Sequence, residues 1–548
     1  MKIELKKMIE SGVRVLAEEF QIKEPPPVLL EVPKKINQGD YSTPVAMALG
    51  ALANQPPRKM AEKLFKLFTL NPMIDSVEIA GPGYLNFKLK NLYWHEVLIE
   101  ILQKKRLYGR SEVGKGTQVQ IEFVSANPTG PLHVGHGRGA VVGDALSNLF
   151  EMTGHHVQRE YYINDVGRQV NLLGQSTLAR FRQLKGENAD IPDEGYLGDY
   201  ITEIAREMVT KNFRIPEDQS EVIPFFMEYA KSKILKGIKE DLDALKVYFT
   251  DWFSEKILYD SNLVNETLEK LKKRGVLYES EGATWFSTLP YGDDKDRIVI
   301  KNNGEKTYYA SDIAYHYHKF RRGFDRVINI WGADHHGYIF RVKAAVEALG
   351  YDPKKLDILL IQLVNLMREG KPVAMSKRSG EYVTLRDVIN EVGTDATRFF
   401  FLTRNTDMAL DFDLELAKRK SNENPVYYVQ YAYARLCSVL KIAGERKIDF
   451  PENHIDLNLL NLEQEISLMK ILAFYPQLIQ DSVESLEPHR LSYYLQELAG
   501  ALHQYYYKNR ILSDNIPLTQ SRLYLTHAIK IVLENALGIL GLHAPERM

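Results

Sequence analysis

Residues 118–136, QVQIEFVSANPTGPLHVGH, decide the fold class of this chain. The first seven residues are rich in apolar and β-branched side chains and predict a buried strand. A turn rich in glycine and proline follows, and a helical pattern then runs from about residue 133 to residue 152. A second strand-like run, HHVQREYYIN, occupies residues 155–164. Strand, turn, helix and strand in this order are typical of the opening of a parallel α/β sheet.

The chain on either side of this stretch suggests three domains. Two later runs, RVINIWG at 326–332 and DILLIQLVN at 357–365, are further strand candidates for the same sheet. Short helical and strand-like pieces before residue 112 predict a small α+β domain. A charge-rich stretch from about 167 to 290 predicts a mostly helical insertion, and long periodic segments after residue 384 predict a helical bundle.

Composition excludes several classes of protein. The 548 residues carry 70 Lys+Arg and 72 Asp+Glu, so with a net charge of −2 any polyanion must be held by local basic patches. A single cysteine, Cys437, excludes an internal disulfide and a multi-cysteine metal site, and is compatible with a reducing cytosol. The longest apolar run is too short for a membrane span, and the acidic N-terminal segment is unlike a signal peptide.

The segment HVGH places His133 and His136 three residues apart. If a helix begins here, both imidazoles lie on one face of its first turn. Helix N-termini attract phosphate through their N–H groups and dipole, and Gly135 would let a nucleotide approach the backbone. We therefore predict a triphosphate cradle. An isolated HxxH pair would be a surface or metal-binding pair, but the preceding Thr129-Gly-Pro makes that alternative less favoured here.

A second basic element lies far downstream, in AMSKRSG at residues 374–380. Glycine and serine indicate a mobile loop, and Lys377 could reach phosphates as a compact point charge. Taken alone, this loop would be a solvated turn. A different alternative comes from GHGRGA at residues 135–140, which matches a loose dinucleotide pattern and would favour a nucleotide-dependent oxidoreductase. The Pro-Thr-Gly-Pro segment before it makes the turn longer than that class requires.

The two motifs together resemble a known family. HVGH resembles the HIGH signature and AMSKR the KMSKS signature of class I aminoacyl-tRNA synthetases, and SANPTGPLHVGH resembles arginyl-tRNA synthetases in particular. Ala374 replaces the first lysine of the second signature and Arg378 its last serine, while Lys377 is kept. Further segments resemble the same family along essentially the whole chain: GDYSTPVA (39–46), AGPGYLNF (80–87), YYINDVGRQ (161–169), DWFSE (251–255), YYASDIAYH (308–316), WGADHHGY (331–338), NPVYYVQYAYARLCS (424–438), LHQYYYKNRIL (502–512) and LGLHAPERM (540–548).

The resemblance implies a multidomain α/β protein. Its expected parts are an N-terminal α+β tRNA-contacting domain (1–112), a Rossmann-like parallel-sheet catalytic domain (113–383) and an all-α anticodon-binding bundle (384–548). The implied function is ligation of L-arginine to its tRNA through arginyl-adenylate. ATP would bring Mg²⁺ with it, and no tightly bound metal held by the protein is expected. We expect a cytoplasmic monomer without a membrane partner. The alternatives are a catalytically inactive tRNA-binding paralogue and, less favoured, an oxidoreductase.

The resemblance also assigns site residues. The catalytic candidates are His133, His136 and Lys377. The candidates for ATP binding are these three with Pro128, Thr129, Gly130, Gly135, Met375 and Ser376. The candidates for arginine binding are Glu122, Asn127, Glu255, Tyr308, Asp312 and His336. The interleaving of tyrosines with Lys and Arg in the C-terminal half, and not the resemblance, gives the candidates for tRNA binding: Tyr428, Tyr431, Arg435, Tyr506 and Arg510.

The residues themselves support part of this assignment. Glu122 should end near the carboxyl edge of its strand, where open sheets bind ligands, and Tyr308 and Asp312 would share a helical face. A solvated or N-capping carboxylate is the alternative for each acid, and Glu255 rests on the resemblance alone. His336 falls in a plausible ligand loop, where a structural histidine pair is an equal alternative. Exposed tyrosines beside Lys and Arg could stack on unpaired bases, although for most of these rings a helix core is favoured.

Overall fold

The structure is a computed structural model that describes residues 2–548 apart from 34–38, 69–70, 374–382 and 449–454. The chain forms two compact units. Unit 1 comprises residues 1–105, 439–473 and 501–531, and unit 2 comprises residues 106–438, 474–500 and 532–548. Four long C-terminal helices contribute residues to both units: α16 (Pro425–Glu445), α17 (Glu463–Ser485), α18 (His489–Lys508) and α19 (Ile516–Ile539).

Unit 1 contains a three-stranded antiparallel sheet in the order β1-β3-β2. Its strands are β1 (Tyr41–Thr43), β2 (Ile74–Ala80) and β3 (Tyr84–Leu89), and its N-terminal helices are α1 (Lys2–Glu19), α2 (Val45–Ala53), α3 (Pro57–Phe68) and α4 (Asn91–Lys104). Gly81 and Gly83 turn the chain between β2 and β3 with positive φ angles, which suit glycine. Leu5, Phe68 and Phe87 are buried in its core. The expected α+β character of the N-terminal region is confirmed.

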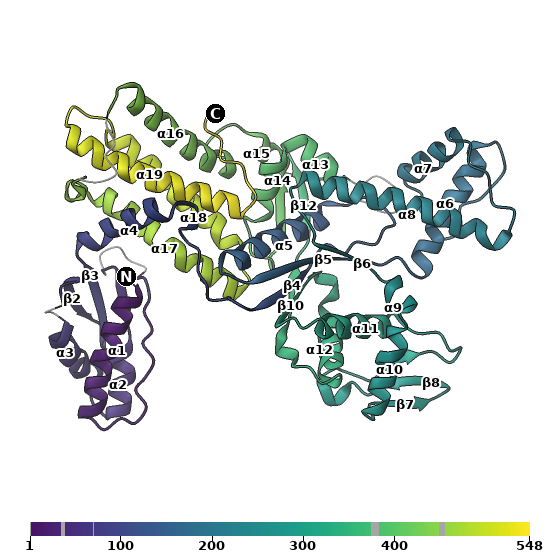
Figure 1. Ribbon diagram of the computed structural model, residues 1–548, viewed down its shortest axis with the longest axis horizontal. Coiled ribbons are helices and arrows are strands. Elements are labelled where there is room, and N and C mark those ends of the chain that lie inside the picture. The colour runs from purple at the N-terminus through teal and green to yellow at the C-terminus, as the bar shows by residue number, and fades with distance from the viewer. Residues whose placement is uncertain (1, 34–38, 69–70, 374–382, 449–454) are drawn as a thin grey trace. The chain divides into compact units, whose positions relative to one another are not determined.

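Unit 2 is built on a five-stranded parallel sheet in the order β11-β10-β4-β5-β6 (Figure 1). The strands are β4 (Gln118–Glu122), β5 (His156–Ile163), β6 (Asp251–Ser254), β10 (Arg326–Gly332) and β11 (Leu356–Ile361). Helix α5 (Val134–Met152) follows β4, as the sequence predicts. The chain moves outward from β4 in one direction through β5 and β6, and then in the other through β10 and β11. This reversal creates a switch point between β4 and β10.

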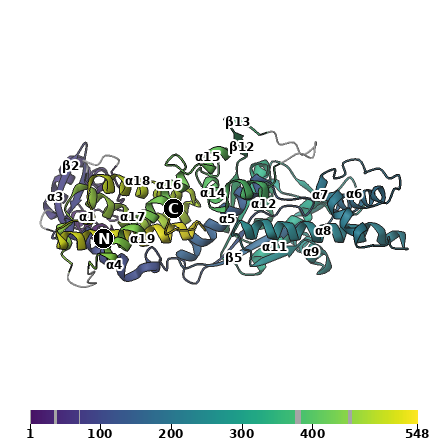
Figure 2. The same cartoon turned by 90° about the horizontal axis from the view of Figure 1, so that it is seen from above.

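The stretch expected to be one mostly helical insertion is more varied. Helices α6 (Arg168–Leu184), α7 (Asp199–Thr210) and α8 (Gln219–Ala244) form a group at the right of Figures 1 and 2. The next residues form β6, which pairs with β5 in the main sheet. A small antiparallel sheet then follows, made of β7 (Leu277–Ser280), β8 (Ala283–Phe286) and β9 (Arg297–Ile300). Strands of four residues are too short to show a period, so the sequence pattern missed them.

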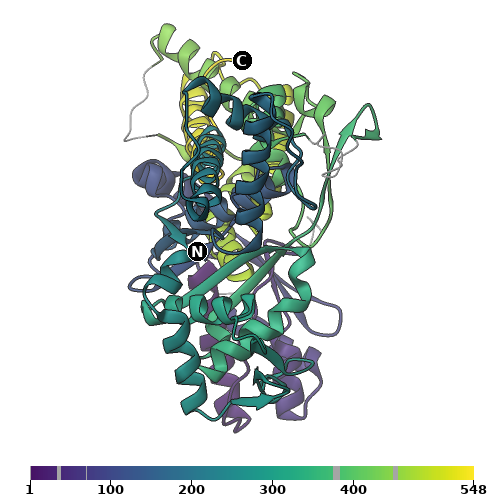
Figure 3. The ribbon, with the colours of Figure 1, turned by 90° about the vertical axis from the view of Figure 1, so that its right-hand side faces the viewer.

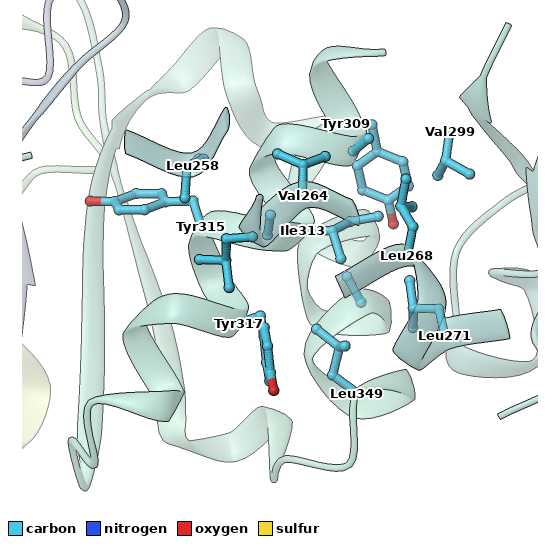
Figure 4. Packing of buried hydrophobic residues seen from close by; sticks show 14 of the residues in the cluster. Leu258, Val264, Leu268, Leu271, Val299, Tyr309, Ile313, Tyr315, Tyr317 and Leu349 are labelled. Carbon is cyan, nitrogen blue, oxygen red and sulfur yellow. The ribbon is translucent and has the colours of Figure 1, made fainter. Parts of the chain in front are cut away.

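A separate apolar core lies beneath this small sheet. It joins α9 (Lys256–Asp260), α10 (Leu263–Lys273), α11 (Tyr308–Arg321) and α12 (Ile339–Ala348). Figure 4 shows Leu268 and Leu271 of α10 facing Tyr309 and Ile313 of α11, with Val299 of β9 beside them. In Figure 3 this teal layer lies below the helices α6 to α8. The packing holds α11 firmly, which matters because α11 carries several site residues.

The remaining elements of unit 2 follow β11. Strands β12 (Val364–Arg368), β13 (Lys371–Pro372) and β14 (Leu410–Asp413) form a third small sheet, and helices α13 (Leu385–Val392), α14 (Thr394–Phe401) and α15 (Leu414–Lys418) accompany it. The described residues include the short 3₁₀ turns η2 (Lys105–Leu107), η3 (Leu289–Tyr291), η4 (Ala333–Tyr338), η5 (Pro353–Lys355) and η6 (Leu457–Leu459). Within the described residues, every helix is too short or too polar to cross a membrane.

Candidate active site

The candidate site lies at the carboxyl end of β4, beside the switch point of the main sheet. The backbone leaves β4 through two consecutive non-glycine residues with positive φ, Val124 at 69° and Ser125 at 39°. This conformation is costly for a β-branched residue such as valine, and such strain is found where the surrounding structure holds a functional turn. The Ser125 hydroxyl donates to Glu122 Oε1 at 2.8 Å and accepts from the N–H of Tyr162 at 3.1 Å.

His133 and His136 lie at the start of α5, as predicted. His133 is the N-cap, and its Nδ1 accepts from the N–H of Gly135 at 3.1 Å. His136 Nδ1 accepts from the N–H of His133 at 3.3 Å. Each ring thus accepts a hydrogen bond from a backbone N–H at the start of the helix. The two rings are stacked with 3.6 Å between their centroids. A neutral imidazole that accepts at Nδ1 carries its proton on Nε2, so both rings can donate to an anion.

The oxidoreductase alternative does not fit the position of its glycines. Gly137 and Gly139 are buried inside α5 and do not line a loop. A Cβ at Gly137 would lie 2.5 Å from the Leu385 side chain, so this glycine permits close helix packing. Gly135 has a local role as well, since a Cβ there would lie 3.0 Å from the His133 ring. The glycine pattern therefore reflects the construction of the helix start.

The downstream lysine loop falls outside the described residues, and with it Met375, Ser376 and Lys377. The structure describes the residues that follow the loop. Thr384 forms a β-bridge with His133, and the N–H of Leu385 donates to the carbonyl of Leu132 at 2.8 Å. The chain that leaves the loop is thus joined directly to the histidine segment. Residues 384 and 385, which follow the loop in sequence, therefore lie beside the segment that begins α5, about 250 residues earlier in the chain.

The turn before α5 holds the other predicted ATP-binding residues. Thr129 accepts through its carbonyl from the Tyr200 hydroxyl at 2.7 Å, and its N–H donates to the Asn127 carbonyl at 2.7 Å. The Asn127 side chain donates to Gln169 Oε1 at 2.6 Å. Pro128 is buried and Gly130 is half-buried. The turn is therefore braced by the segment that begins α6 and by α7.

Glu122 lies at the end of β4, where the sequence predicts it. Its side chain is almost fully buried, and its Oε2 accepts from Lys319 Nζ at 2.5 Å. Lys319 belongs to α11 and is completely buried. A buried carboxylate needs such a partner, because an unpaired charge would be very costly there. Sequence patterns did not single out Lys319, which is 197 residues away from Glu122.

Glu255 and Asp312 differ from Glu122, since neither forms an ion pair with the described residues. Glu255 is 3% exposed and its Oε2 has no hydrogen-bond partner there. Burial, and next the charge of Asp312, raises the pKa of Glu255 to about 7. Burial also raises the pKa of Asp312 to about 6, against a hydrogen bond from the Tyr338 hydroxyl. The described part of the site thus holds two carboxyl groups that are not paired with a cation.

The last two predicted arginine-binding residues are exposed. Tyr308 begins α11, one helical turn before Asp312, and is 61% exposed. A Cβ at Gly167 would lie 3.3 Å from its hydroxyl, so the ring covers that glycine. His336 is exposed in η4. The neighbouring His335 is exposed as well.

Sequence reasoning therefore missed several residues around the acids. Tyr338 donates to Asp312, and the Tyr259 hydroxyl forms a 2.6 Å hydrogen bond with Ser311 beside it. Both lie in or next to segments that resemble the family, but a segment match does not say which side chains point inward. A further hollow of about 690 Å³ borders Tyr259 and is lined by both polar and apolar side chains, among them Asp165, Arg168, Val170 and Met227.

The predicted tRNA-binding residues lie on α16 and on α18, apart from Arg510, which follows the end of α18. On α16, Tyr428 and Tyr431 are half-buried, and the Arg435 guanidinium lies 4.5 Å from the centre of the Tyr431 ring. At the end of α18, Tyr506 is 39% exposed and Arg510 is also exposed. The expectation that most of these rings belong to a helix core is confirmed for two neighbours, Tyr433 and Tyr505, which are buried. The most exposed ring of this region, Tyr507 at 90%, was not singled out.

Among the described residues there is no group of three or more His, Cys, Asp or Glu side chains arranged to hold a metal ion.

Three family models match the chain in sequence. They are described as the arginyl tRNA synthetase N terminal domain (residues 4–89), the catalytic domain of class I (R) tRNA synthetases (97–419) and the DALR anticodon binding domain (429–548). The chain is 50% identical over 529 residues to an arginine–tRNA ligase of Citrifermentans bemidjiense, with 96% of each protein covered. It is 49% identical to an arginine–tRNA ligase of Syntrophotalea carbinolica, with 100% of each covered.

The fold is also similar to that of a solved arginyl-tRNA synthetase. The arginyl-tRNA synthetase of Thermus thermophilus aligns with a TM-score of 0.78 over 100% of both chains, at 22% sequence identity, which speaks for the fold alone. Together with the paired histidines at the switch point and the neighbouring acids, the family models and the close relatives lead to one conclusion. The chain belongs to the arginyl-tRNA synthetase family of class I aminoacyl-tRNA synthetases.

Proposed function

We propose that this enzyme ligates L-arginine to its tRNA in two steps. The carboxylate of arginine attacks the α-phosphate of ATP, which forms arginyl-adenylate and releases diphosphate. A ribose hydroxyl of the terminal adenosine of the tRNA then takes the arginyl group and AMP leaves. The observation that carries this proposal is the pair of buried carboxyl groups, Glu255 and Asp312, which form no ion pair with the described residues.

Glu255 and Asp312 would bind the guanidinium group. Each has a raised pKa because burial and the neighbouring negative charge disfavour its ionised form. A guanidinium supplies the missing positive charge and, through its planar fork, parallel hydrogen bonds that lysine or citrulline cannot copy. A site built on such bonds rejects misfits by about 10⁴-fold without editing. Glu122 already has a cation in Lys319, so it would contact arginine as an oriented acceptor, beside Asn127.

The start of α5 would bind the phosphates of ATP. His133 and His136 can donate from Nε2, and the N–H groups of the first turn and the helix dipole favour negative charge. Phosphoryl transfer mainly needs the reactants placed in line and the charge neutralised. Lys377 would neutralise the diphosphate side. Mg²⁺ would arrive with ATP and keep several of its waters, because it loses them reluctantly.

The tRNA would be held by the C-terminal helices. Tyrosine rings beside arginine and lysine can stack on unpaired anticodon bases while the cations meet phosphates. The exposed residues of α18 and the Tyr431–Arg435 pair of α16 support this role. We further propose that the enzyme works as a cytoplasmic monomer without a membrane partner. Size-exclusion chromatography with light scattering tests whether the enzyme is a monomer. A mass near twice the 62.9 kDa of the chain would refute the monomer.

Charging of a total tRNA pool with each of the twenty amino acids tests the proposed function. We expect arginine alone to be attached, with stoichiometric formation of AMP and diphosphate. Attachment of another amino acid at a comparable rate would refute the specificity that we derive from the two acids. Binding of tRNA without any charging would favour the inactive paralogue.

A further inference from the structure

A row of polar side chains crosses the middle of the main sheet in unit 2. Asn329 of β10, Glu122 of β4 and Glu160 of β5 are neighbours in register on three adjacent strands. All three are buried, with Asn329 and Glu160 at 0% exposure. Central strands of parallel sheets are normally apolar on both faces, because helices cover them. This row therefore needs partners, and its presence calls for an explanation.

Helix α11 supplies those partners from its buried face. Lys319 Nζ donates to Glu122 at 2.5 Å and to Asn329 Oδ1 at 2.7 Å. Arg322, at the end of the helix, donates to both oxygens of Glu160 at 2.6 and 3.0 Å, and the Tyr315 hydroxyl donates to the same carboxylate at 2.5 Å. Figure 4 shows Tyr315 beside the apolar core that fixes α11. Each acid of the row is thus paired with one cation of α11.

The directions of the hydrogen bonds extend this row to Asp312. Lysine only donates, so Asn329 must turn its oxygen toward Lys319 and its amide N–H toward His316 Nε2, at 2.8 Å. His316 then carries its proton on Nδ1 and donates to the carbonyl of Asp312 at 2.7 Å. Burial, and next the charge of Lys319, lowers the pKa of His316 to about 3, so the ring stays neutral. One directed chain therefore joins Glu122, Lys319, Asn329, His316 and Asp312.

A contribution to stability alone does not account for this chain of buried hydrogen bonds. Replacement of a buried ion pair by well-packed apolar side chains is often neutral or stabilising. Lys319 is at 0% exposure, and its Nζ also lies 4.5 Å from the centre of the Tyr315 ring, so it is enclosed on all sides by its partners. It can act on a substrate only through the groups that it holds.

We propose that Lys319 is a positioning residue for arginine binding. It holds the Glu122 carboxylate at the end of β4, and through Asn329 and His316 it ties that carboxylate to the helical turn that carries Asp312. The two acids, which lie on separate elements, are thereby kept in one geometry. This inference rests on the proposed roles of Glu122 and Asp312 as arginine ligands. It adds a residue that determines how tightly these ligands bind arginine.

Aminoacylation kinetics with arginine, ATP and tRNA varied in turn test the proposal on full-length Lys319→Met, Glu122→Gln and the double variant. We expect Lys319→Met to raise the KM for arginine about tenfold or more, while the KM values for ATP and tRNA stay within about twofold. In the Glu122→Gln background the same substitution should change the arginine KM less than about threefold, because Lys319 acts through Glu122. Lys354→Met, an exposed lysine of η5, is the matched control.

Three outcomes would overturn the proposal: an equal effect of Lys319→Met in both backgrounds, an equal rise in the KM for ATP, or an unchanged KM for arginine. If Lys319→Met does not fold, Asn329→Ala keeps the Lys319–Glu122 ion pair and removes the hydrogen bonds that Asn329 forms with Lys319 and His316. This variant should raise the KM for arginine about threefold or more. An unchanged KM for arginine would refute the role of the hydrogen-bond chain. A wild-type enzyme that fails to charge arginine would instead refute the proposed function itself.

Discussion

Arginine binding should weaken as the pH falls, because Glu255 and Asp312 must be ionised to receive the guanidinium group. The pKa of Glu255 is raised to about 7 and that of Asp312 to about 6 in the free site. A bound guanidinium favours the ionised form of both carboxyl groups, and so lowers both pKa values. The enzyme therefore has its full affinity for arginine above pH 8. This affinity decreases as the pH falls first through 7 and then through 6.

The size of the effect follows from these two values. At pH 6, a carboxyl group with a pKa of about 7 is ionised in about one molecule in eleven, and one with a pKa of about 6 in about half. The apparent affinity for arginine should fall about twentyfold between pH 8 and pH 6, which is about 1.8 kcal/mol. At pH 6.5 the two groups together hold about one proton, which arginine should displace.

Two measurements check this prediction. The first is kcat/KM for arginine from pH 5.5 to 9, with ATP and tRNA saturating. The second is calorimetric titration of the enzyme–tRNA complex with arginine at pH 6.5, in two buffers of different ionisation enthalpy, which counts the protons released. Citrulline has the shape of arginine without its charge, so any binding of citrulline should release almost none.

Substitution of Glu255 separates this explanation from a general effect of pH. Glu255→Gln removes the group with the higher pKa, so it should weaken arginine binding by about 10²-fold or more and reduce the remaining change between pH 8 and 6 to about twofold. Glu217→Gln, at an exposed position, is the control and should behave like the wild type. An arginine affinity that is flat from pH 8 to 6, or binding without proton release, would refute the reasoning.

Three further predictions concern other parts of the molecule. His136→Ala should lower aminoacylation by about 10²-fold or more with tRNA affinity nearly unchanged, since it removes a donor to the reacting phosphate; an equal loss of tRNA binding would contradict that role. Arg398→Met should lower the midpoint of urea unfolding, because Arg398 is fully buried and donates to Asp144 at 2.5 Å, so its loss should cost about 3 kcal/mol or more; an unchanged midpoint would show that this ion pair is dispensable. Tyr507→Ala should raise the KM for tRNA about fivefold or more while leaving the KM for arginine unchanged, because this ring is 90% exposed and a lost stacking contact costs about 1–3 kcal/mol; equal kinetics would exclude a tRNA contact there.

Local patterns in the sequence were enough for the framework of the site. The run at 118–124 and the helical period after residue 133 predicted β4 and α5 within two residues of their observed ends. The spacing of His133 and His136 predicted that both rings lie on the first turn, and their rings are indeed stacked there. These features depend on residues within a few positions of one another, where helix and strand periods are strong.

Some features could be named from the sequence but not placed. The resemblance pointed to Glu255 and Asp312, yet only the folded chain shows that Glu255 is buried and lies close enough to Asp312 for that charge to raise its pKa further. The resemblance likewise included the segment 331–338, but the structure was needed to show that Tyr338 contacts Asp312 while His336 is exposed. Which side chain of a loop points inward depends on what packs against the loop, and that is not a local property.

The sequence by itself therefore determined the family, the strand–turn–helix start and the residue types available for arginine and ATP. Tertiary structure decided which of those residues cooperate. Lys319 meets Glu122 because α11 crosses the strand 197 residues earlier in the chain, and Asn329 joins them because the parallel register places it beside Glu122. The physical reason is that burial makes an unpaired charge costly. The role of each acid therefore depends on its partners, which the packing of the sheet and its helices brings from distant segments.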